Sequence, residues 1–275
     1  YTTLFRSSKN NASKKSGSGK NSYNAYYKKN DDGFQPKSNG KSNYGKKKYP
    51  SKSKGYPKKN AQKPSIKIAF LGGLNEIGKN ITLVECENDI IIIDCGMAFP
   101  DGDMLGVDLV IPDFTYIEQN ADRVKGIILT HGHEDHIGGL PFLLSKVNVP
   151  IYGTPLTLGL VGNKLKEHSL YNQSQLNVIN AGQSIKLGCM KIDFIHVNHS
   201  IPDAVAFAIH TPGGTIVHTG DFKIDCTPIT GDMIDLSSFA RVGDEGVLAL
   251  LSESTNAERP GYTPTDRTVS DSLDN

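Results

Sequence analysis

Thr130-His131-Gly132-His133-Glu134-Asp135-His136-Ile137-Gly138-Gly139 is the stretch of this sequence that decides its fold. It places three imidazoles and a carboxylate within six positions, in the pattern H-x-H-x-D-H, directly after the apolar run 126–129. Imidazole and carboxylate groups are ligands for zinc and similar divalent ions. A strand that ends in a sharp turn can direct all four side chains at one small volume. Because core histidines are usually solitary, the cluster predicts a metal site rather than a polar turn.

The net charge of +1 hides two oppositely charged segments. Residues 8–63 hold sixteen lysines, no arginine and two aspartates, a net charge of +14. Residues 64–275 hold 13 Lys and Arg against 27 Asp and Glu, a net charge of −14, and Arg6 supplies the last unit. The basic segment is built from Lys, Asn, Ser, Gly and Tyr, so it cannot bury enough apolar surface to form a core. We therefore predict a disordered arm over residues 8–64, followed by a folded body.

Tyrosines lie between the lysines of this arm. Lysine contacts phosphates and aromatic rings stack on unpaired bases, so the pattern suits single-stranded nucleic acid. A solubilising tail, or a tether to an anionic surface, fits the same composition equally well. The RNA-contacting positions that we predict in the arm are Lys46, Lys47, Lys48, Tyr49, Lys58 and Lys59.

Both ends of the chain look artificial. Residues 1–7 differ in composition from the rest of the chain and read like the translation of a sequencing-adapter oligonucleotide, so we exclude them from the fold as an artefact. Residues 271–275 stop without a closing element, which predicts a truncated reading frame.

Cysteine spacing and hydropathy bear on the compartment. The four cysteines are scattered without a C-x-x-C pair, so neither a disulfide framework nor a cysteine zinc site is expected. The sequence has no apolar run of 18 residues and no signal-peptide core near its start. We therefore expect a cytoplasmic protein without membrane association.

Short β-rich runs bounded by Gly, Asn, Asp or Pro dominate the chain from residue 65 onward. The expected strands are 66–71, 81–84, 90–94, 126–130, 192–197, 205–209, 215–219 and 247–252. The expected helices are 140–147 and 156–168. Strands with interspersed helices predict an α/β fold with sheets in its core.

Residues 73–80 fit the pattern G-x-x-x-x-G-K of a phosphate-binding loop. Such a loop needs Ser or Thr after the lysine to hold magnesium, and a helix beyond it. Here Asn80 occupies that position and a strand pattern comes next, so we interpret the segment as a strand connection rather than a nucleotide site.

Further candidate ligands follow other expected strands. His199 and Asp221 come shortly after two of them, and Asp94 closes a third. Each is weak evidence alone, since a terminal aspartate is more often a turn former. Their ordered recurrence after the H-x-H-x-D-H loop favours a dinuclear hydrolytic site, which needs more ligands than one loop supplies.

This ordered set of residues resembles the metallo-β-lactamase superfamily. More narrowly, residues 72–80, 130–140, 198–203 and 250–260 resemble bacterial ribonuclease J, of the β-CASP branch, over about residues 66–260. The resemblance implies a metallo-β-lactamase αββα sandwich over residues 65–250. It also implies that residues 251–275 begin an inserted β-CASP domain, so that the chain is an N-terminal fragment.

The resemblance implies two Zn2+ ions, with other divalent ions as alternatives. One ion would be held by His131, His133 and His199, and the second by Asp135 and His136, while Asp221 would bridge both.

Further roles are implied by the same resemblance. Asp135, Asp221 and Glu253 would be catalytic; Glu253 matches the first β-CASP motif, where the subfamily commonly has Asp. Asp94 would orient a ligand histidine through a hydrogen bond. The resemblance assigns no role to His218, but it precedes Asp221 by three positions, so its nearness to the predicted site makes it a candidate for a similar supporting role. A remaining histidine, three positions before His199, is interpreted as structural.

The activity implied is 5′-to-3′ exonuclease and endonuclease cleavage of RNA in maturation and decay. RNA would be the substrate, and the full-length protein would form a homo-oligomer or pair with a partner ribonuclease. Two alternatives stay open: a small-molecule hydrolase of the thioester type, and a non-catalytic RNA-binding subunit, which should have lost ligands that are all present here. We expect the 275 residues alone to bind metal weakly and to show little nuclease activity.

Overall fold

Four consecutive isoleucines show how the molecule is layered. Ile90, Ile91, Ile92 and Ile93 lie in β4 (Asp89–Ile93), and all four are buried. Successive side chains of a strand point to opposite faces of the sheet. Ile90 and Ile92 accordingly join one apolar cluster, while Ile91 and Ile93 join another. The strand is therefore covered on both faces, as interior strands of layered α/β proteins are.

The computed structural model describes residues 2–6, 63–229 and 231–273. Within them the strands form two six-stranded sheets. The first sheet contains, in spatial order, β2 (Ile66–Gly72), β3 (Ile81–Cys86), β4, β5 (Val124–Ile128), β6 (Ile151–Gly153) and β7 (Leu176–Val178). The second contains β1 (Thr2–Arg6), β12 (Ala249–Glu253), β11 (Gly214–His218), β10 (Val205–Thr211), β9 (Met190–His196) and β8 (Ser184–Leu187).

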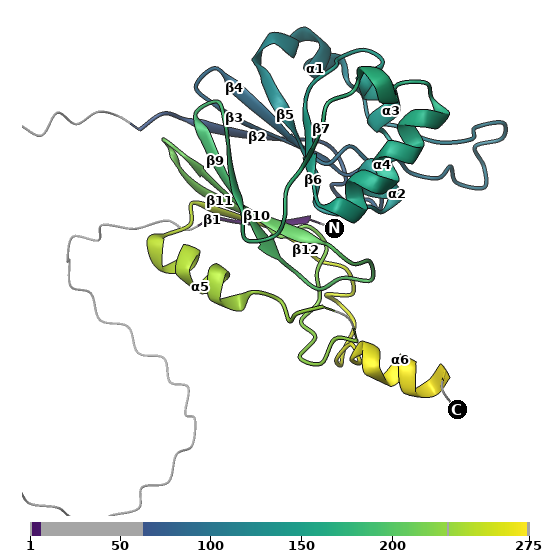
Figure 1. Cartoon of the computed structure of the whole chain (residues 1–275), viewed down its shortest axis with the longest axis vertical. Coiled ribbons are helices and arrows are strands. Elements are labelled where there is room, and N and C mark those ends of the chain that lie inside the picture. The colour runs from purple at the N-terminus through teal and green to yellow at the C-terminus, as the bar shows by residue number, and fades with distance from the viewer. Residues whose placement is uncertain (1, 7–62, 230, 274–275) are drawn as a thin grey trace, which may run out of the picture. The chain divides into compact units, whose positions relative to one another are not determined.

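Helices lie on the outer faces of both sheets (Figure 1). The α-helices of the described residues are α1 (Thr115–Gln119), α2 (Glu134–Ile137), α3 (Leu140–Leu144), α4 (Pro155–Glu167), α5 (Leu236–Glu245) and α6 (Asp266–Leu273). Two 3-10 turns, Ala121–Arg123 and Tyr171–Gln173, complete the set. Figure 1 shows α1, α3 and α4 beside the first sheet and α5 beside the second. The order of layers is helix, sheet, sheet, helix, which confirms the predicted α/β sandwich.

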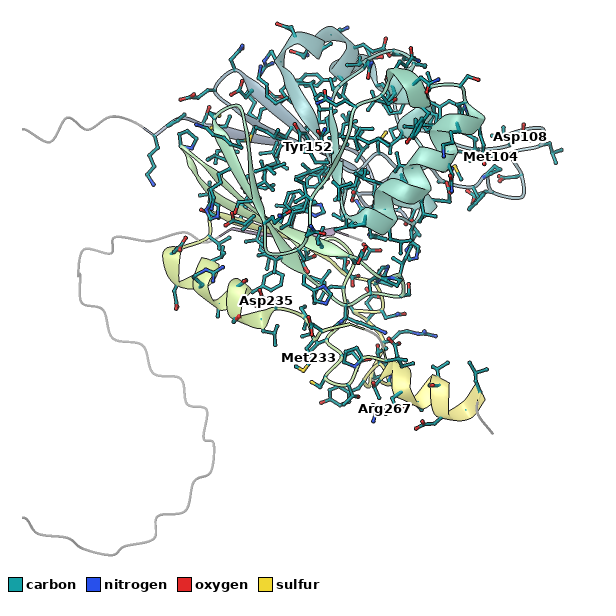
Figure 2. All side chains as sticks on the ribbon, in the orientation of Figure 1. Met104, Asp108, Tyr152, Met233, Asp235 and Arg267 are labelled. Carbon is teal, nitrogen blue, oxygen red and sulfur yellow. The ribbon has the colours of Figure 1, made fainter. Side chains whose placement is uncertain are left out.

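The apolar core between the two sheets joins side chains from both. The rings of Phe194 and Phe207 meet edge to face with their centroids 5.1 Å apart, and both are buried. Tyr152 of the first sheet packs against the same cluster, and Figure 2 shows it in the middle of the sandwich. A separate cluster lies between the second sheet and α5 and contains Val242 of that helix. Burial of this apolar surface is the main stabilising contribution to the fold.

All eight expected strands are present, and their ends shift by at most two residues. The expected helices at 140–147 and 156–168 appear as α3 and α4, the first ending three residues early. The short strands β6, β7 and β8 were not expected from the sequence. Each has only three or four residues, which is too short for an alternating pattern to stand out.

Two differences concern the predicted boundaries. The predicted end of the sandwich at residue 250 falls inside β12, whose parallel pairing with β11 includes Leu251, so the second sheet continues past it to Glu253. Residues 1–7 were excluded from the fold, yet the backbone of β1 pairs antiparallel with β12. The adapter origin of that segment stays a prediction, and the arm, including its six predicted RNA-contacting residues, lies almost wholly outside the described residues.

Two further sequence predictions concern cysteines and membranes. All four cysteines are free in the structure, and Cys86 and Cys95 are buried. In the part of the chain that the structure describes, no helix has the length and apolar character that crossing a bilayer requires.

Candidate metal centre

Strand direction brings the predicted ligands to one edge of the sandwich. β4 and β5 run parallel, so the segments after them, which carry Asp94 and the H-x-H-x-D-H loop, start at the same edge of the first sheet. In the second sheet β9 and β11 are both antiparallel to β10, and β12 is parallel to β11. The segments that follow β9 and β11, with His199 and Asp221, therefore also share one edge.

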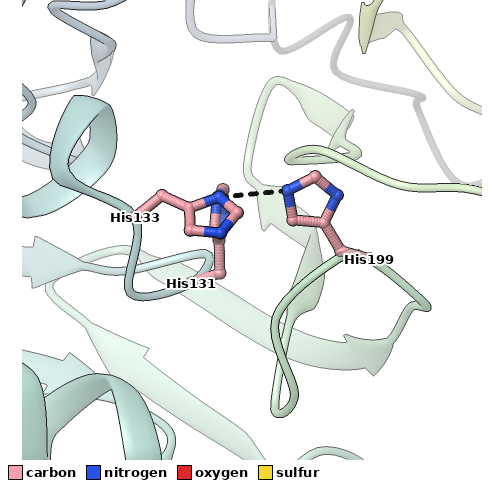
Figure 3. A group of neighbouring side chains, drawn as sticks. All are labelled: His131, His133 and His199. Atoms are coloured by element: carbon pink, nitrogen blue, oxygen red, sulfur yellow. Dashed lines mark hydrogen bonds between the residues drawn. The ribbon is translucent and has the colours of Figure 1, made fainter. Parts of the chain in front are cut away.

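Three imidazoles converge at this edge. His133 Nδ1 lies 3.0 Å from His131 Nε2 and 3.2 Å from His199 Nε2. Figure 3 shows His133 and His199 reaching this point from two different loops. Zn–N bonds of about 2.0–2.1 Å in a tetrahedral site put ligand nitrogens about 3.3 Å apart. The observed spacing therefore suits one ion held by three histidines.

A second group of ligand atoms adjoins the first. His131, His136 and Asp221 each offer an atom within 4.8 Å of the others. Asp221 Oδ2 is 3.5 Å from His136 Nε2 and 3.8 Å from His199 Nε2, so it lies between the two groups. Asp135 Oδ2 is also 3.5 Å from His136 Nε2. The structure thus brings all six predicted ligands together, and it adds His131 to the second group, which the sequence does not suggest.

Asp94 fixes the orientation of His136. Its Oδ2 lies 2.8 Å from His136 Nδ1 and also accepts the hydroxyl of Thr130, while its Oδ1 accepts the Thr130 backbone N–H. With Nδ1 donating to this carboxylate, the lone pair of Nε2 faces Asp221 and Asp135. That tautomer is the one that a metal ligand needs, and a carboxylate on the distal ring nitrogen is the usual supporting contact.

The electrostatics of the cluster favour a positive charge on the His136 ring, which a metal ion at Nε2 would supply in place of a proton. Burial lowers the pKa of His131 and His199, which keeps these rings neutral and able to ligate. Burial also acts to lower the pKa of His136, but the carboxylates of Asp94 and Asp221 outweigh it and raise that pKa to about 10. Burial opposes ionisation of Asp221 as well, yet its interaction with His136 holds the pKa of that carboxyl below its usual range.

Two polar residues of the centre were missed from the sequence. Thr130 precedes the first histidine, and its hydroxyl donates a hydrogen bond to Asp94 Oδ2. Asn80 donates its amide N–H to the Asp135 carboxylate at 3.2 Å. In the sequence Asn80 stands out only because it breaks the phosphate-loop pattern. β3 comes directly after it, which supports the interpretation of residues 73–80 as a strand connection.

His218 and Glu253 line one small cavity together with Asp94 and Asp221. His218 Nδ1 accepts the backbone N–H of Gly220, and burial lowers the pKa of its ring. The Glu253 carboxylate accepts the backbone N–H two residues later, from Thr255. Both residues are thus close to the ligands without joining either ligand group.

The other histidines have structural partners. His196 Nε2 donates to the backbone oxygen of Asp232, which supports its interpretation as structural. His210 pairs with Asp193 at 3.0 Å, and His168 packs its ring against Phe142.

Comparisons with known proteins agree with this geometry. A family model described as "Metallo-beta-lactamase superfamily" matches residues 74–255. Ribonuclease J 1 of Streptococcus pyogenes is 50% identical over 208 residues, which are 76% of this chain and 37% of that protein. Ribonuclease J2 of Bacillus subtilis is 47% identical over 213 residues, 78% of this chain and 38% of that protein.

A third relative gives the same picture. Ribonuclease J of Thermus thermophilus is 48% identical over 216 residues, 76% of this chain and 38% of that protein. The chain thus spans a little over a third of the length of these relatives. The resemblance to bacterial ribonuclease J is confirmed, and the chain belongs to the metallo-β-lactamase superfamily.

Proposed function

We propose that this protein is a metal-dependent ribonuclease that cleaves RNA by 5′-to-3′ exonuclease and endonuclease action during RNA maturation and decay. The observation that carries the proposal is the position of Asp221 Oδ2 between the two ligand groups. Paired metal sites of this kind suit in-line displacement at a phosphodiester. Identities of 47–50% to three ribonuclease J proteins support the choice of RNA.

The metals that we propose are two Zn2+ ions, because the donors are imidazoles and carboxylates. The first ion would be held by His131, His133 and His199, and the second by Asp135, His136 and Asp221, with Asp221 shared. Two such ions would supply Lewis-acid activation of water and neutralise charge on the phosphodiester.

The chain's own residues would position the substrate and handle protons. Asp94 holds the His136 ring in place, and Asp221, kept ionised, holds positive charge between the groups. The Asp135 side chain is 35% exposed, so its carboxylate can reach a proton on an entering or leaving oxygen. Glu253 and His218 would support Asp221 from the shared small cavity.

Space for a substrate adjoins the first ligand group. A cavity of about 560 Å³ is lined by His199, by Ser200 and by the apolar side chains of Ile201, Pro202 and Ile229, among others. A group attached to a phosphodiester at the metals can enter it beside His199. The basic arm would add non-specific contacts to RNA phosphates. We further propose that the protein acts in the cytoplasm, as a homo-oligomer or with a partner ribonuclease.

Two competing functions make different predictions. A thioester hydrolase uses the same ligands but needs no basic arm, and a non-catalytic RNA-binding subunit needs the arm but not the ligands. The arm and the complete ligand set occur together here, which favours a nuclease over either alternative.

The deciding experiment uses the full-length protein and short RNAs labelled at either end. Zn2+ should produce cleavage that leaves 5′-phosphate ends, faster on 5′-monophosphate than on 5′-triphosphate RNA. The Asp221→Ala variant should lose this activity by at least about 100-fold. Hydrolysis of a small thioester but not of RNA would replace the proposal with the first alternative. Binding of RNA without hydrolysis of either substrate would replace it with the second.

A further inference from the structure

Asn80 contacts the candidate metal centre from a loop to which no function has been assigned. Its Nδ2 donates to Asp135 Oδ2 at 3.2 Å and to the Asp135 backbone oxygen at 3.1 Å, and it lies 3.1 Å from His136 Nε2. The two acceptors of Asp135 identify this atom as the amide nitrogen rather than the amide oxygen, since an oxygen there would face two other oxygens.

The backbone around Asn80 holds the amide in place. The backbone N–H of Asn80 donates to the backbone oxygen of Asp135 at 3.0 Å, and the backbone oxygen of Asn80 accepts the N–H of Gly96 at 2.9 Å. The backbone N–H of Lys79 donates to the backbone oxygen of Met97 at 3.0 Å. Residues 79–80 are therefore hydrogen-bonded to two other segments of the centre. A side chain on Gly73, which has φ +80°, would crowd the Asn80 amide oxygen. Glycine at that position therefore leaves room for the amide.

The contact to Asp135 determines where that carboxylate points. The Asp135 side chain is 35% exposed, so on its own it can rotate into solvent. The Asn80 amide holds Oδ2, which lies 3.5 Å from His136 Nε2, a spacing that suits two ligands of one ion. The same amide nitrogen lies 3.1 Å from His136 Nε2, so it contacts both candidate ligands of the second ion.

We propose that Asn80 is a positioning residue of the second metal site, acting through Asp135 and His136 without ligating the ion. The inference rests on the proposed two-metal centre, but not on RNA as its substrate. It gives the loop that looks like a phosphate-binding motif a different role: its last residue aligns a carboxylate instead of cradling a phosphate.

The test is a Co2+ titration of the full-length protein, followed by calorimetry and by the visible absorption of the bound ion. The wild-type protein should bind two ions in two steps. Asn80→Ala should weaken one step by about 10- to 100-fold, the usual cost of removing an outer hydrogen-bond partner. The other step should stay within about threefold of wild type, because His131, His133 and His199 are untouched. A purely structural role would shift both steps together.

Asn177→Ala is the matched control. Asn177 is also half-buried and donates its amide to a backbone oxygen, that of Ile151, but it lies in β7. Its loss should leave both binding steps unchanged. Asn80→Leu keeps the branching of the side chain at Cγ but has no donor, so this variant tests the inference if the alanine variant fails to fold.

Three results would overturn the inference: unchanged binding in both Asn80 variants, an equal weakening of both steps, or a wild-type chain that binds no Co2+. Failure of the proposed function appears separately, as two-step metal binding without cleavage of RNA.

Discussion

Asp94 Oδ2 lies 2.8 Å from His136 Nδ1, and the two side chains are only 2–3% exposed. Asp94 adopts φ +59°, a left-handed conformation that is uncommon outside glycine. The chain therefore turns sharply where β4 ends, and this turn puts the carboxylate under the histidine ring. Strained backbone of this kind tends to occur at functional sites.

Replacing Asp94 should weaken metal binding without removing a ligand. In Asp94→Asn the His136 ring loses a charged acceptor, so the affinity for metal at that site should fall by about 10- to 100-fold. Asp108→Asn, on an exposed loop that Figure 2 marks, should bind like wild type. Zn2+ competition against a chromogenic chelator measures both. Equal affinities in the two variants would show that Asp94 does not support the ligand.

Gly96→Ala should be far more damaging than its size suggests. A β-carbon on Gly96 would overlap the backbone oxygen of Asp135, so the loops of the centre would have to separate. We expect a loss of about 3 kcal/mol or more in the free energy of unfolding. Gly102→Ala is the control, since nothing lies near a β-carbon there. Urea denaturation of both variants provides the comparison, and similar midpoints would contradict the packing argument.

Asp235 should stabilise the protein in a pH-dependent way. It caps α5 by accepting the Ser238 backbone N–H, and hydrogen bonds from Ser237 and Ser238 lower its pKa to about 2 from an ordinary value of 3.8. Because the folded-state pKa is the lower one, this contribution is complete above about pH 4 and is lost as the pH falls toward 2. Asp235→Ala should cost about 1 kcal/mol at pH 7.

The pH series needs a neighbouring control. Asp232→Ala removes an exposed carboxylate three positions before Asp235 and should change stability little at any pH. The difference between Asp235→Ala and wild type should shrink between pH 4 and pH 2, as followed by urea denaturation. A difference that is constant over this range would assign the effect to packing rather than to the charged cap.

The basic arm should control how RNA affinity depends on salt. Deleting residues 8–63 removes sixteen lysines, so single-stranded RNA should bind more weakly and the plot of log K against log salt should become flatter. Replacing the arm's tyrosines with alanine should reduce affinity while keeping the salt slope, because stacking is not ionic. Fluorescence anisotropy over a salt series distinguishes the two changes. An unchanged slope after deletion would favour a solubilising tail.

The sheets were predictable because their strands carry strong local signals. The run from Ile90 to Ile93 has to be covered on both faces, and the turn residues around each expected strand limit its length. Short strands such as β6 depend on pairing with a neighbour, which a single sequence does not show. Amphipathic α5 was missed for a related reason: only the second sheet provides the surface that buries Val242.

The candidate metal centre was predictable because several chemically related side chains recur after strands. Asn80 was not, since an amide carries no metal signature and its contact with Asp135 spans 55 positions. Thr130 was hidden for the opposite reason: beside His131, a threonine looks like the end of an ordinary strand. The sequence reveals side chains that can ligate a metal. The residues that orient those side chains can be identified only from the structure, where distant loops come together.

The candidate ligands come from both halves of the sandwich: His131, His133 and His136 extend from the first sheet, while His199 and Asp221 extend from the second. An ion bound here would therefore cross-link the two sheets, which otherwise contact each other mainly through apolar packing. Substitutions in the apolar core, for example at Phe194 or Phe207, should therefore change the affinity of the distant site for metal, because they alter how the two sheets pack. Resistance to chelators would report how well the two halves fit together.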